Sequence, residues 1–161
     1  MPRRRGFTLI ELLIVVAIIG IITAIAVVNM FSAIQRAKQK KSMGDMKTIA
    51  TALEAYAMDQ DMYPAAAAFS LPSGLSLPAG TFGAIAGSLA PTYVRVVPML
   101  DGWNSYFLYG ANATRSDFAL CSSGADGVPE TSPVGGATTN FNADIILVDG
   151  TFVQFPEGAQ R

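Results

Sequence analysis

Residues 6–31 read GFTLIELLIVVAIIGIITAIAVVNMF, and this stretch decides the fold of the first part of the chain. The run is apolar except for one carboxylate, Glu11, near its start, and a basic stub, Met1–Arg5, precedes it. As a helix that rises about 1.5 Å per residue, residues 12–31 are long enough to cross a bilayer core about 30 Å thick. A carboxylate inside such a segment is costly and usually marks a functional residue.

Three interpretations compete for this segment. The first is a plain membrane anchor, and the second is a secretory signal peptide cleaved near Ala24-Ile25-Ala26. In the third, residues 1–6 are a short leader that is cut off between Gly6 and Phe7, and the apolar segment begins the mature chain. Glu11 separates them, because an anchor or a signal peptide gains nothing from a charge that costs up to about 3 kcal/mol at the centre of a membrane helix. The arginines of the stub favour a cytoplasmic N-terminus, and the basic residues beyond the span weaken that preference.

The basic stub, Gly6 and the sequence Phe-Thr-Leu-Ile-Glu (residues 7–11) resemble the N-terminus of the type IV pilin superfamily, which includes the pseudopilins of type II secretion. The resemblance implies that a prepilin peptidase cuts after Gly6 and N-methylates Phe7. It also implies that Glu11 pairs with the N-terminal amine of a neighbouring subunit when the apolar helices form a filament core. Many family members carry proline at the position of Val28, so we expect a straighter helix here, with Gly20 as its softer point.

Composition limits the function classes. The chain has 161 residues and a formal charge of −1, which would become −4 without residues 1–6, because three arginines and no acids lie there. This balance argues against nucleic-acid binding. Histidine is absent, and neither a phosphate-binding loop nor a cysteine pair is present, so we expect no enzyme. The one cysteine, Cys121, is expected in the core of a strand, with a reactive thiol as the alternative.

The helix is expected to continue beyond the apolar segment, because residues 33–59 contain no proline. Apolar residues recur there at helical spacing and form a stripe: Met46, Ile49, Ala50, Leu53, Tyr56 and Ala57. We expect this stripe to pack on the protein's own sheet; a partner helix is the alternative. A basic cluster near the start of this part is expected to be solvated or to contact acids of neighbouring subunits: Arg36, Lys38, Lys40 and Lys41. Pro64 restricts Tyr63 to extended geometry, so the helix should end near Asp59–Asp61.

The remainder predicts a small antiparallel sheet on the second half of the helix, which makes the fold α+β. Residues 65–83 indicate a connector that Phe69, Leu71 and Phe82 would pin to the domain, and residues 84–89 indicate a short helix. The expected strands are Tyr106–Tyr109, Asp117–Ser122, Asp144–Val148 and Thr151–Phe155. Asp149-Gly150 between the last two predicts a two-residue hairpin turn.

Two further stretches resemble major pseudopilins. Residues 53–64 are similar to the end of the long helix in that family. Residues 101–106 (DGWNSY) are similar to its Asp-Pro-Trp-Gly-x-Pro-Tyr motif, with Gly102 and Ser105 in place of the prolines and Asn104 in place of the glycine. We expect Trp103 to anchor the core, with a ligand platform as the alternative.

A loop that binds calcium in pseudopilins is the third resemblance. Residues 122–127 (SSGADG) and the later Ala-Asp-Ile resemble that site, which implies calcium ligands from Asp126 and Asp144, with Leu120 and Ser123 as further oxygen donors. Asn140 and Asn142 alternate with Asp144 and could add oxygens. The segment 128–143 is longer than the usual family loop and poor in acids, so two aspartates in ordinary turns are the alternative.

These resemblances imply a leader (residues 1–6), a membrane and filament-core helix (7–31), its amphipathic continuation (32–61) and a globular head (62–161). The implied function is a structural subunit of a type II secretion pseudopilus. A type IV pilus subunit and a membrane-tethered periplasmic domain are the alternatives. Implied partners are copies of the chain itself, prepilin peptidase, other pilin-like subunits, an inner-membrane platform protein with its ATPase, and lipid before assembly. The implied location is the inner membrane with the head in the periplasm, then a periplasmic pseudopilus or surface pilus.

Overall fold

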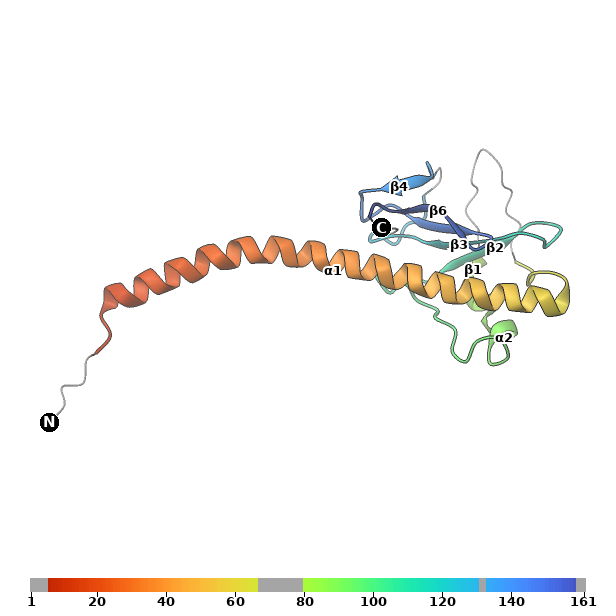
Figure 1. Cartoon of the computed structure of the whole chain (residues 1–161), viewed down its shortest axis with the longest axis horizontal. Helices are drawn as coiled ribbons and strands as arrows, with labels where there is room; N and C mark the ends of the chain where they lie inside the picture. Colours follow the sequence, from red (N-terminus) through yellow and green to blue (C-terminus); the bar gives the residue numbers. More distant parts are fainter. Residues whose placement is uncertain (1–5, 67–79, 131–132, 159–161) are drawn as a thin grey trace. The chain divides into compact units, whose positions relative to one another are not determined.

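The computed structural model of this chain describes residues 6–66, 80–130 and 133–158 (Figure 1). The chain divides into two compact units, Met1–Arg36 and Ala37–Arg161, which we call the N-terminal unit and the head. Phe69 and Leu71, which we expected to pin the connector, lie outside the described residues.

One helix, α1 (Leu9–Gln60), contributes to both units. It runs unbroken through Gly20 and Val28, as a sequence without internal proline allows. It ends at Gln60, and Asp61 then adopts a left-handed backbone with φ 58° three residues before Pro64. The predicted end of the helix is therefore confirmed.

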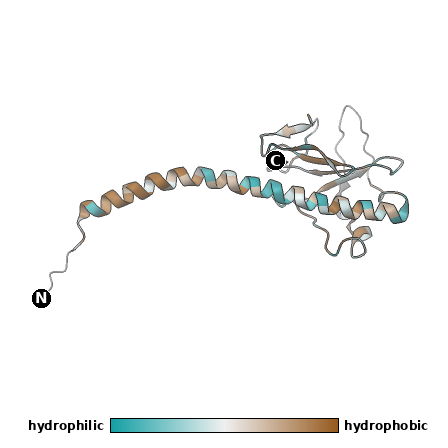
Figure 2. Ribbon diagram, in the orientation of Figure 1, coloured by the Kyte–Doolittle hydropathy of each residue, from teal (hydrophilic) through white to brown (hydrophobic). Residues whose placement is uncertain are grey.

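Within the N-terminal unit, α1 is apolar on all sides. Its large side chains between Leu9 and Phe31 are exposed wherever they are described, and the segment is long and apolar enough to cross a membrane. Figure 2 shows this part of the helix as a nearly continuous brown ribbon, whereas the part in the head alternates between brown and teal. A helix that is hydrophobic all round requires an apolar environment, which a bilayer or other helices provide.

The head contains a six-stranded sheet with strand order β1-β2-β3-β5-β6-β4. The strands are β1 (Gly80–Thr81), β2 (Leu108–Ala111), β3 (Phe118–Ser122), β4 (Gly136–Thr138), β5 (Ile145–Val148) and β6 (Thr151–Pro156). Every neighbouring pair is antiparallel except β4 and β6, which run parallel. The expected antiparallel sheet and α+β class are confirmed, and β1 and β4 are edge strands that the sequence did not indicate.

The start of β2 differs from the prediction. Tyr106 makes only an isolated bridge with Leu100, and the strand begins at Leu108. The reason is local: Phe107 donates its backbone N–H to Met99 at 3.2 Å, so the chain first pairs with the segment that precedes it. The short helix is confirmed as α2 (Ala86–Leu89), preceded by the 3-10 turn η1 (Phe82–Ala84).

The two last strands form the predicted hairpin. Val148 pairs with Thr151, and the two turn residues have positive φ, 46° at Asp149 and 75° at Gly150. These are the signs that a type I′ turn requires. The Asp149 carboxylate also accepts a hydrogen bond from the backbone N–H of Phe118 at 2.8 Å, which ties the turn to β3.

The core lies between α1 and one face of the sheet. Met46, Ile49, Ala50 and Leu53 of the predicted stripe are at most 2% exposed and belong to one cluster. Their partners come from the sheet and the α2 region: Phe82, Leu89, Phe107, Tyr109, Phe118, Leu120, Ile145 and Leu147. The stripe thus packs on the protein's own sheet, as expected. A smaller cluster holds residues of β3 and β5 that alternate with these, among them the fully buried Cys121.

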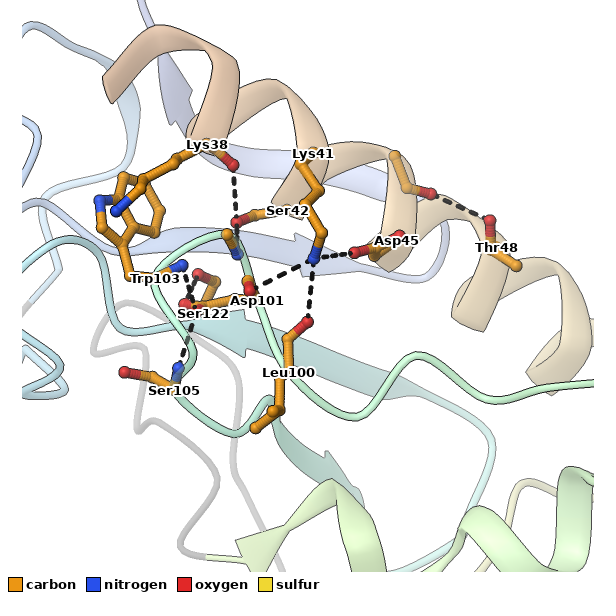
Figure 3. Close-up of polar contacts among 12 residues, drawn as sticks. Lys38, Lys41, Ser42, Asp45, Thr48, Leu100, Asp101, Trp103, Ser105 and Ser122 are labelled. Atoms are coloured by element: carbon orange, nitrogen blue, oxygen red, sulfur yellow. Dashed lines mark hydrogen bonds and ion pairs between the residues drawn. The ribbon is translucent and has the colours of Figure 1, made fainter. Parts of the chain in front are cut away.

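The loop from Asp101 to Ser105 is fastened to α1 by several polar contacts (Figure 3). The Ser42 hydroxyl accepts a hydrogen bond from the N–H of Gly102 at 2.9 Å and donates to the Lys38 carbonyl at 3.0 Å. The Lys41 ammonium pairs with Asp45 at 3.0 Å and also donates to the carbonyl of Asp101. Gly102 consequently lies directly against the backbone of the helix.

Asp101 organises the rest of this loop. Its carboxylate is buried and accepts backbone hydrogen bonds from Trp103 and Ser105, both at 2.9 Å, and a third from the Ser122 hydroxyl at 2.7 Å. Trp103 is partly buried and packs against the main core, in agreement with the expected anchor. Because Ser122 ends β3, the Asp101 loop also supports the start of the loop that carries Asp126.

Candidate functional site

At the N-terminus, Thr8 and Glu11 form a reciprocal pair that begins α1. The Glu11 carboxylate accepts hydrogen bonds from the backbone N–H of Thr8 at 2.8 Å and from its hydroxyl at 2.7 Å. The Glu11 N–H in turn donates to the Thr8 hydroxyl at 3.3 Å. This is a capping box, which satisfies donors that the first turn of a helix leaves free.

The capping box leaves both residues accessible. Gly6, Phe7, Thr8 and Glu11 are all exposed, and a Cβ added at Gly6 would meet no described atom within 4 Å. A carboxylate that is already oriented by its own subunit, on an exposed and otherwise apolar helix, is suited to exchange one partner for another at an interface. The basic stub that precedes Gly6 lies outside the described residues.

In the head, the loop that follows β3 contacts the segment that precedes β5. The backbone N–H of Ala125 donates to the carbonyl of Phe141 at 2.9 Å. Gly124 has φ 64°, and a Cβ there would lie 2.5 Å from the carbonyl oxygen of Asn142. Only glycine allows this close approach, which brings the 122–127 loop against the segment that precedes Asp144.

Asp144 is the most unusual side chain of this region, because it is fully buried without a cationic partner among the described residues. Its Oδ2 accepts hydrogen bonds from the Glu130 N–H at 2.9 Å and from the Cys121 thiol at 3.4 Å. Its Oδ1 is buried and has no hydrogen-bond partner within the part of the chain that is described. The pKa of Asp144 is raised to about 6, mainly by burial and in addition by the charges of Glu130 and Asp126, while the hydrogen bonds from the Glu130 N–H and the Cys121 thiol oppose the rise.

The other predicted ligands occupy different positions. Asp126 is exposed and accepts a hydrogen bond from the Val128 N–H at 3.0 Å, an ordinary turn contact. Ser123 is buried at the start of the loop. Leu120 lies inside β3, where its cross-strand partners are Tyr109 and Leu147, and its side chain is in the core. Only its backbone carbonyl oxygen could act as a metal ligand.

The two asparagines stabilise the second segment. Asn140 accepts a hydrogen bond from the Asn142 N–H at 3.0 Å, and both side chains are exposed. In the ranges that the structure describes, no three Asp, Glu, Cys or His side chains converge as a ready metal centre. The region offers one buried carboxylate oxygen that has no partner among the described residues, and carboxylate oxygens are ligands of the kind that calcium uses.

Two residues of this region were missed from the sequence. Gln154 of β6 is 1% exposed and donates to both Glu130 and the backbone of Asp144. A polar residue within a strand that reads TFVQFP is usually assigned to the solvent face, and Glu130 carries no motif. No local signal distinguishes either residue.

Comparison with known proteins decides the family. The family model described as type II secretion system (T2SS), protein G matches residues 29–141. This chain belongs to that family. The model described as the prokaryotic N-terminal methylation motif matches residues 1–27, which include the capping box.

Individual relatives agree with the assignment to the protein G family. The type II secretion system core protein G of Pseudomonas aeruginosa is 36% identical over 134 residues, which cover 79% of this chain and 89% of that protein. The protein of the same name from Klebsiella pneumoniae is 28% identical over 82% of this chain and 92% of its own length. The type IV major pilin protein PilA of Myxococcus xanthus is 48% identical over 62 residues, 38% of this chain and 28% of the pilin. No solved structure gives a significant match.

Proposed function

We propose that this chain is a structural subunit of a type II secretion pseudopilus that polymerises through α1. The observation that carries the proposal is the joint match of the head to the protein G family and of residues 1–27 to the methylation motif. The exposed apolar helix supports it, because side chains such as Ile10 and Leu13 need an apolar environment in every state of the protein. Lipid supplies that environment before assembly, and helices of neighbouring subunits supply it afterwards.

Glu11 guides docking in this proposal. Its carboxylate leaves the Thr8 capping box in part and pairs with the amine of Phe7 on an adjacent subunit, which removes the cost of a single charge among apolar helices. The test is Glu11→Ala in cells, with Thr8→Ala as the variant that disturbs the same capping box but keeps the carboxylate. We expect Glu11→Ala to be cleaved and methylated but to form no filaments, and Thr8→Ala to retain them. Filaments of normal length in Glu11→Ala would refute this role.

Processing supplies the amine that Glu11 binds. A prepilin peptidase cuts after Gly6 and methylates Phe7 in this proposal. Intact-mass analysis of the protein extracted from membranes should give a chain that begins at Phe7 and carries one extra methyl group. Retention of Met1 would instead support a tethered periplasmic domain.

The remaining partners follow from the same mechanism. Other pilin-like subunits and an inner-membrane platform protein would receive the processed chain, with the head in the periplasm. Protease added to spheroplasts should remove the head and leave the apolar segment. A head that stays intact until the inner membrane is lysed would contradict this orientation.

A type IV pilus is the second candidate, and the similarity to the Myxococcus xanthus pilin favours it only over 62 residues. Those residues make up 38% of this chain and 28% of the pilin. The head matches the protein G family, so we retain the pseudopilus as the proposal.

We further propose that the loop site binds calcium. The support is the Oδ1 of Asp144, which is buried, has no hydrogen-bond partner among the described residues and would be satisfied by a divalent cation. The charge of Asp126 acts on the same carboxylate. Asp144 and Asp126 would hold the ion together with backbone carbonyls at Leu120 and Ser123. When bound, the ion would cross-link the 122–127 loop to the segment before β5.

The calcium proposal is tested by thermal unfolding of the protein with millimolar calcium or with chelator. We expect calcium to raise Tm, and Asp126→Ala to abolish that increase. Glu157→Ala removes an exposed acid elsewhere on the head and should leave the increase intact. An unchanged Tm of the wild-type protein on addition of calcium would refute the site.

A further inference from the structure

Gln154 is a buried amide at the point where β6 meets two other segments. It lies near the middle of β6, pairs with Ile146 of β5 on one side and with Gly136 of β4 on the other, and is 1% exposed. Burying an amide costs free energy unless its polar atoms are hydrogen-bonded. The partners of this side chain therefore show what it does.

Three partners surround the Gln154 amide, and each belongs to a different segment. Its Nε2 donates to the backbone carbonyl of Asp144 and to the Glu130 carboxylate, both at 3.0 Å. Its Oε1 accepts from the N–H of Gly135, also at 3.0 Å. The partners fix the orientation of the amide, because the opposite orientation would place Oε1 against two oxygen acceptors.

The segments that Gln154 contacts make further hydrogen bonds to Asp144 and to the end of β6. The N–H of Glu130 donates to the Asp144 carboxylate at 2.9 Å. Beyond Gly135, the chain enters β4, which pairs with β6 alone, and the Thr138 carbonyl accepts a hydrogen bond from Glu157 at 2.8 Å. The Gln154 side chain thus joins Glu130, Gly135 and the backbone next to β5.

We infer that Gln154 is a latch that fixes Glu130 and residues 133–138 against β5 and β6 without a metal ion. A residue with both a donor and an acceptor is needed, because the latch must bind two oxygens and one N–H at once. No carboxylate or hydroxyl at this position provides two donors. Glu130 and Gly135 are therefore held in place by a side chain of this protein rather than by an ion.

The latch also shapes the proposed calcium site. Because Glu130 is held next to Asp144, Oδ2 of that carboxylate stays occupied by the Glu130 N–H and Oδ1 is left free. A cation would then meet a site that is already folded. This consequence rests on the calcium proposal, whereas the latch itself does not.

The experiment is hydrogen exchange of the full chain in detergent micelles, with chelator present throughout. Gln154→Met keeps the length of the side chain and removes all three hydrogen bonds, and Gln154→Glu keeps only an acceptor. Thr151→Ala, at the exposed start of β6, is the matched control. The reporters are the amides of Gly135–Thr138, compared with those of β2 and β3.

We expect both Gln154 variants to speed exchange of Gly135–Thr138 by about tenfold or more, as loss of two or three buried hydrogen bonds implies. Amides of β2 and β3 should change by less than about twofold, and Thr151→Ala should resemble the wild-type protein. Unchanged exchange at Gly135–Thr138 would overturn the latch. Equal acceleration in β2 and β3 would overturn it as well, because it would mean that Gln154 supports only the global fold.

A second experiment distinguishes ordering by Gln154 from ordering by calcium. The same measurement on the wild-type protein with millimolar calcium should leave Gly135–Thr138 as protected as in chelator. If these amides are protected only when calcium is present, the ion holds the segment and the latch is refuted. If the segment is protected in chelator and calcium titration gives no heat of binding, the latch stands and the calcium proposal fails.

Discussion

Gly102 offers a sharp test of how the 101–105 loop packs on the part of α1 that lies in the head. A Cβ at this position would lie 2.3 Å from the carbonyl oxygen of Lys38 and 2.8 Å from its carbonyl carbon and Cα. These are backbone atoms of a helix and cannot rotate away. Gly102→Ala must therefore push the loop off the helix and stretch the 2.9 Å hydrogen bond from Gly102 to Ser42.

The magnitude follows from three terms. Overpacking costs about 1–3 kcal/mol, and weakening of the hydrogen bond costs about 0.5–1.5 kcal/mol. Replacing glycine also lowers the conformational entropy of the unfolded chain, which stabilises the folded protein by about 0.4–1 kcal/mol. We expect the free energy of unfolding to fall by about 0.5–4 kcal/mol, the range of the two costs less the gain.

Urea unfolding followed by tryptophan fluorescence measures this change, because the only tryptophan, Trp103, is the next residue. Gly44→Ala is the matched control, since it lies on α1 with nothing within 4 Å of the added Cβ and should stabilise the protein by up to about 1 kcal/mol. Gly102→Pro, the residue of the family motif, should also destabilise, because it deletes the donor to Ser42. A Gly102→Ala protein within about 0.5 kcal/mol of wild type would refute the packing described here.

Three further predictions concern other parts of the chain. Leu53→Ala, at a fully buried position of the helix stripe, should lower the free energy of unfolding by about 2–5 kcal/mol in urea titration, and a loss below about 1 kcal/mol would contradict its place in the core. Gly150→Ala should destabilise the hairpin, because φ is 75° and the new Cβ would lie 2.7 Å from the Glu54 carboxylate; an unchanged Tm would argue against the type I′ turn. Thr8→Val should weaken the first turn of α1 by about 0.5–2 kcal/mol, measured as faster amide exchange of Ile10 and Glu11 in micelles, with equal exchange as the contrary result.

The sequence predicted those features that local patterns determine. The apolar run, the helical stripe around Leu53 and the Asp149-Gly150 turn each depend on residues close in the chain, and all three are confirmed. The roles of Glu11 and of calcium stay predictions.

The remaining features depend on contacts between distant residues. β4 is a three-residue strand without alternation, and only its pairing with β6 makes it a strand. Gln154 looks like a surface residue until three segments close around it. In the same way, Gly102 has no conformational reason to be glycine except its approach to Lys38, 64 positions earlier in the numbering. Sequence periodicity carries no information on such contacts.

The central claim is that this chain is a pseudopilus subunit required for protein export. The most direct measurement compares a strain that lacks the chain with the same strain complemented by the wild-type protein or by Glu11→Ala. We expect exported proteins to accumulate in the periplasm of the deletion strain, to reach the medium again with the wild-type protein and to stay in the periplasm with Glu11→Ala, while surface pili remain normal in all three. Normal export together with loss of surface pili would contradict the account and assign the chain to a type IV pilus.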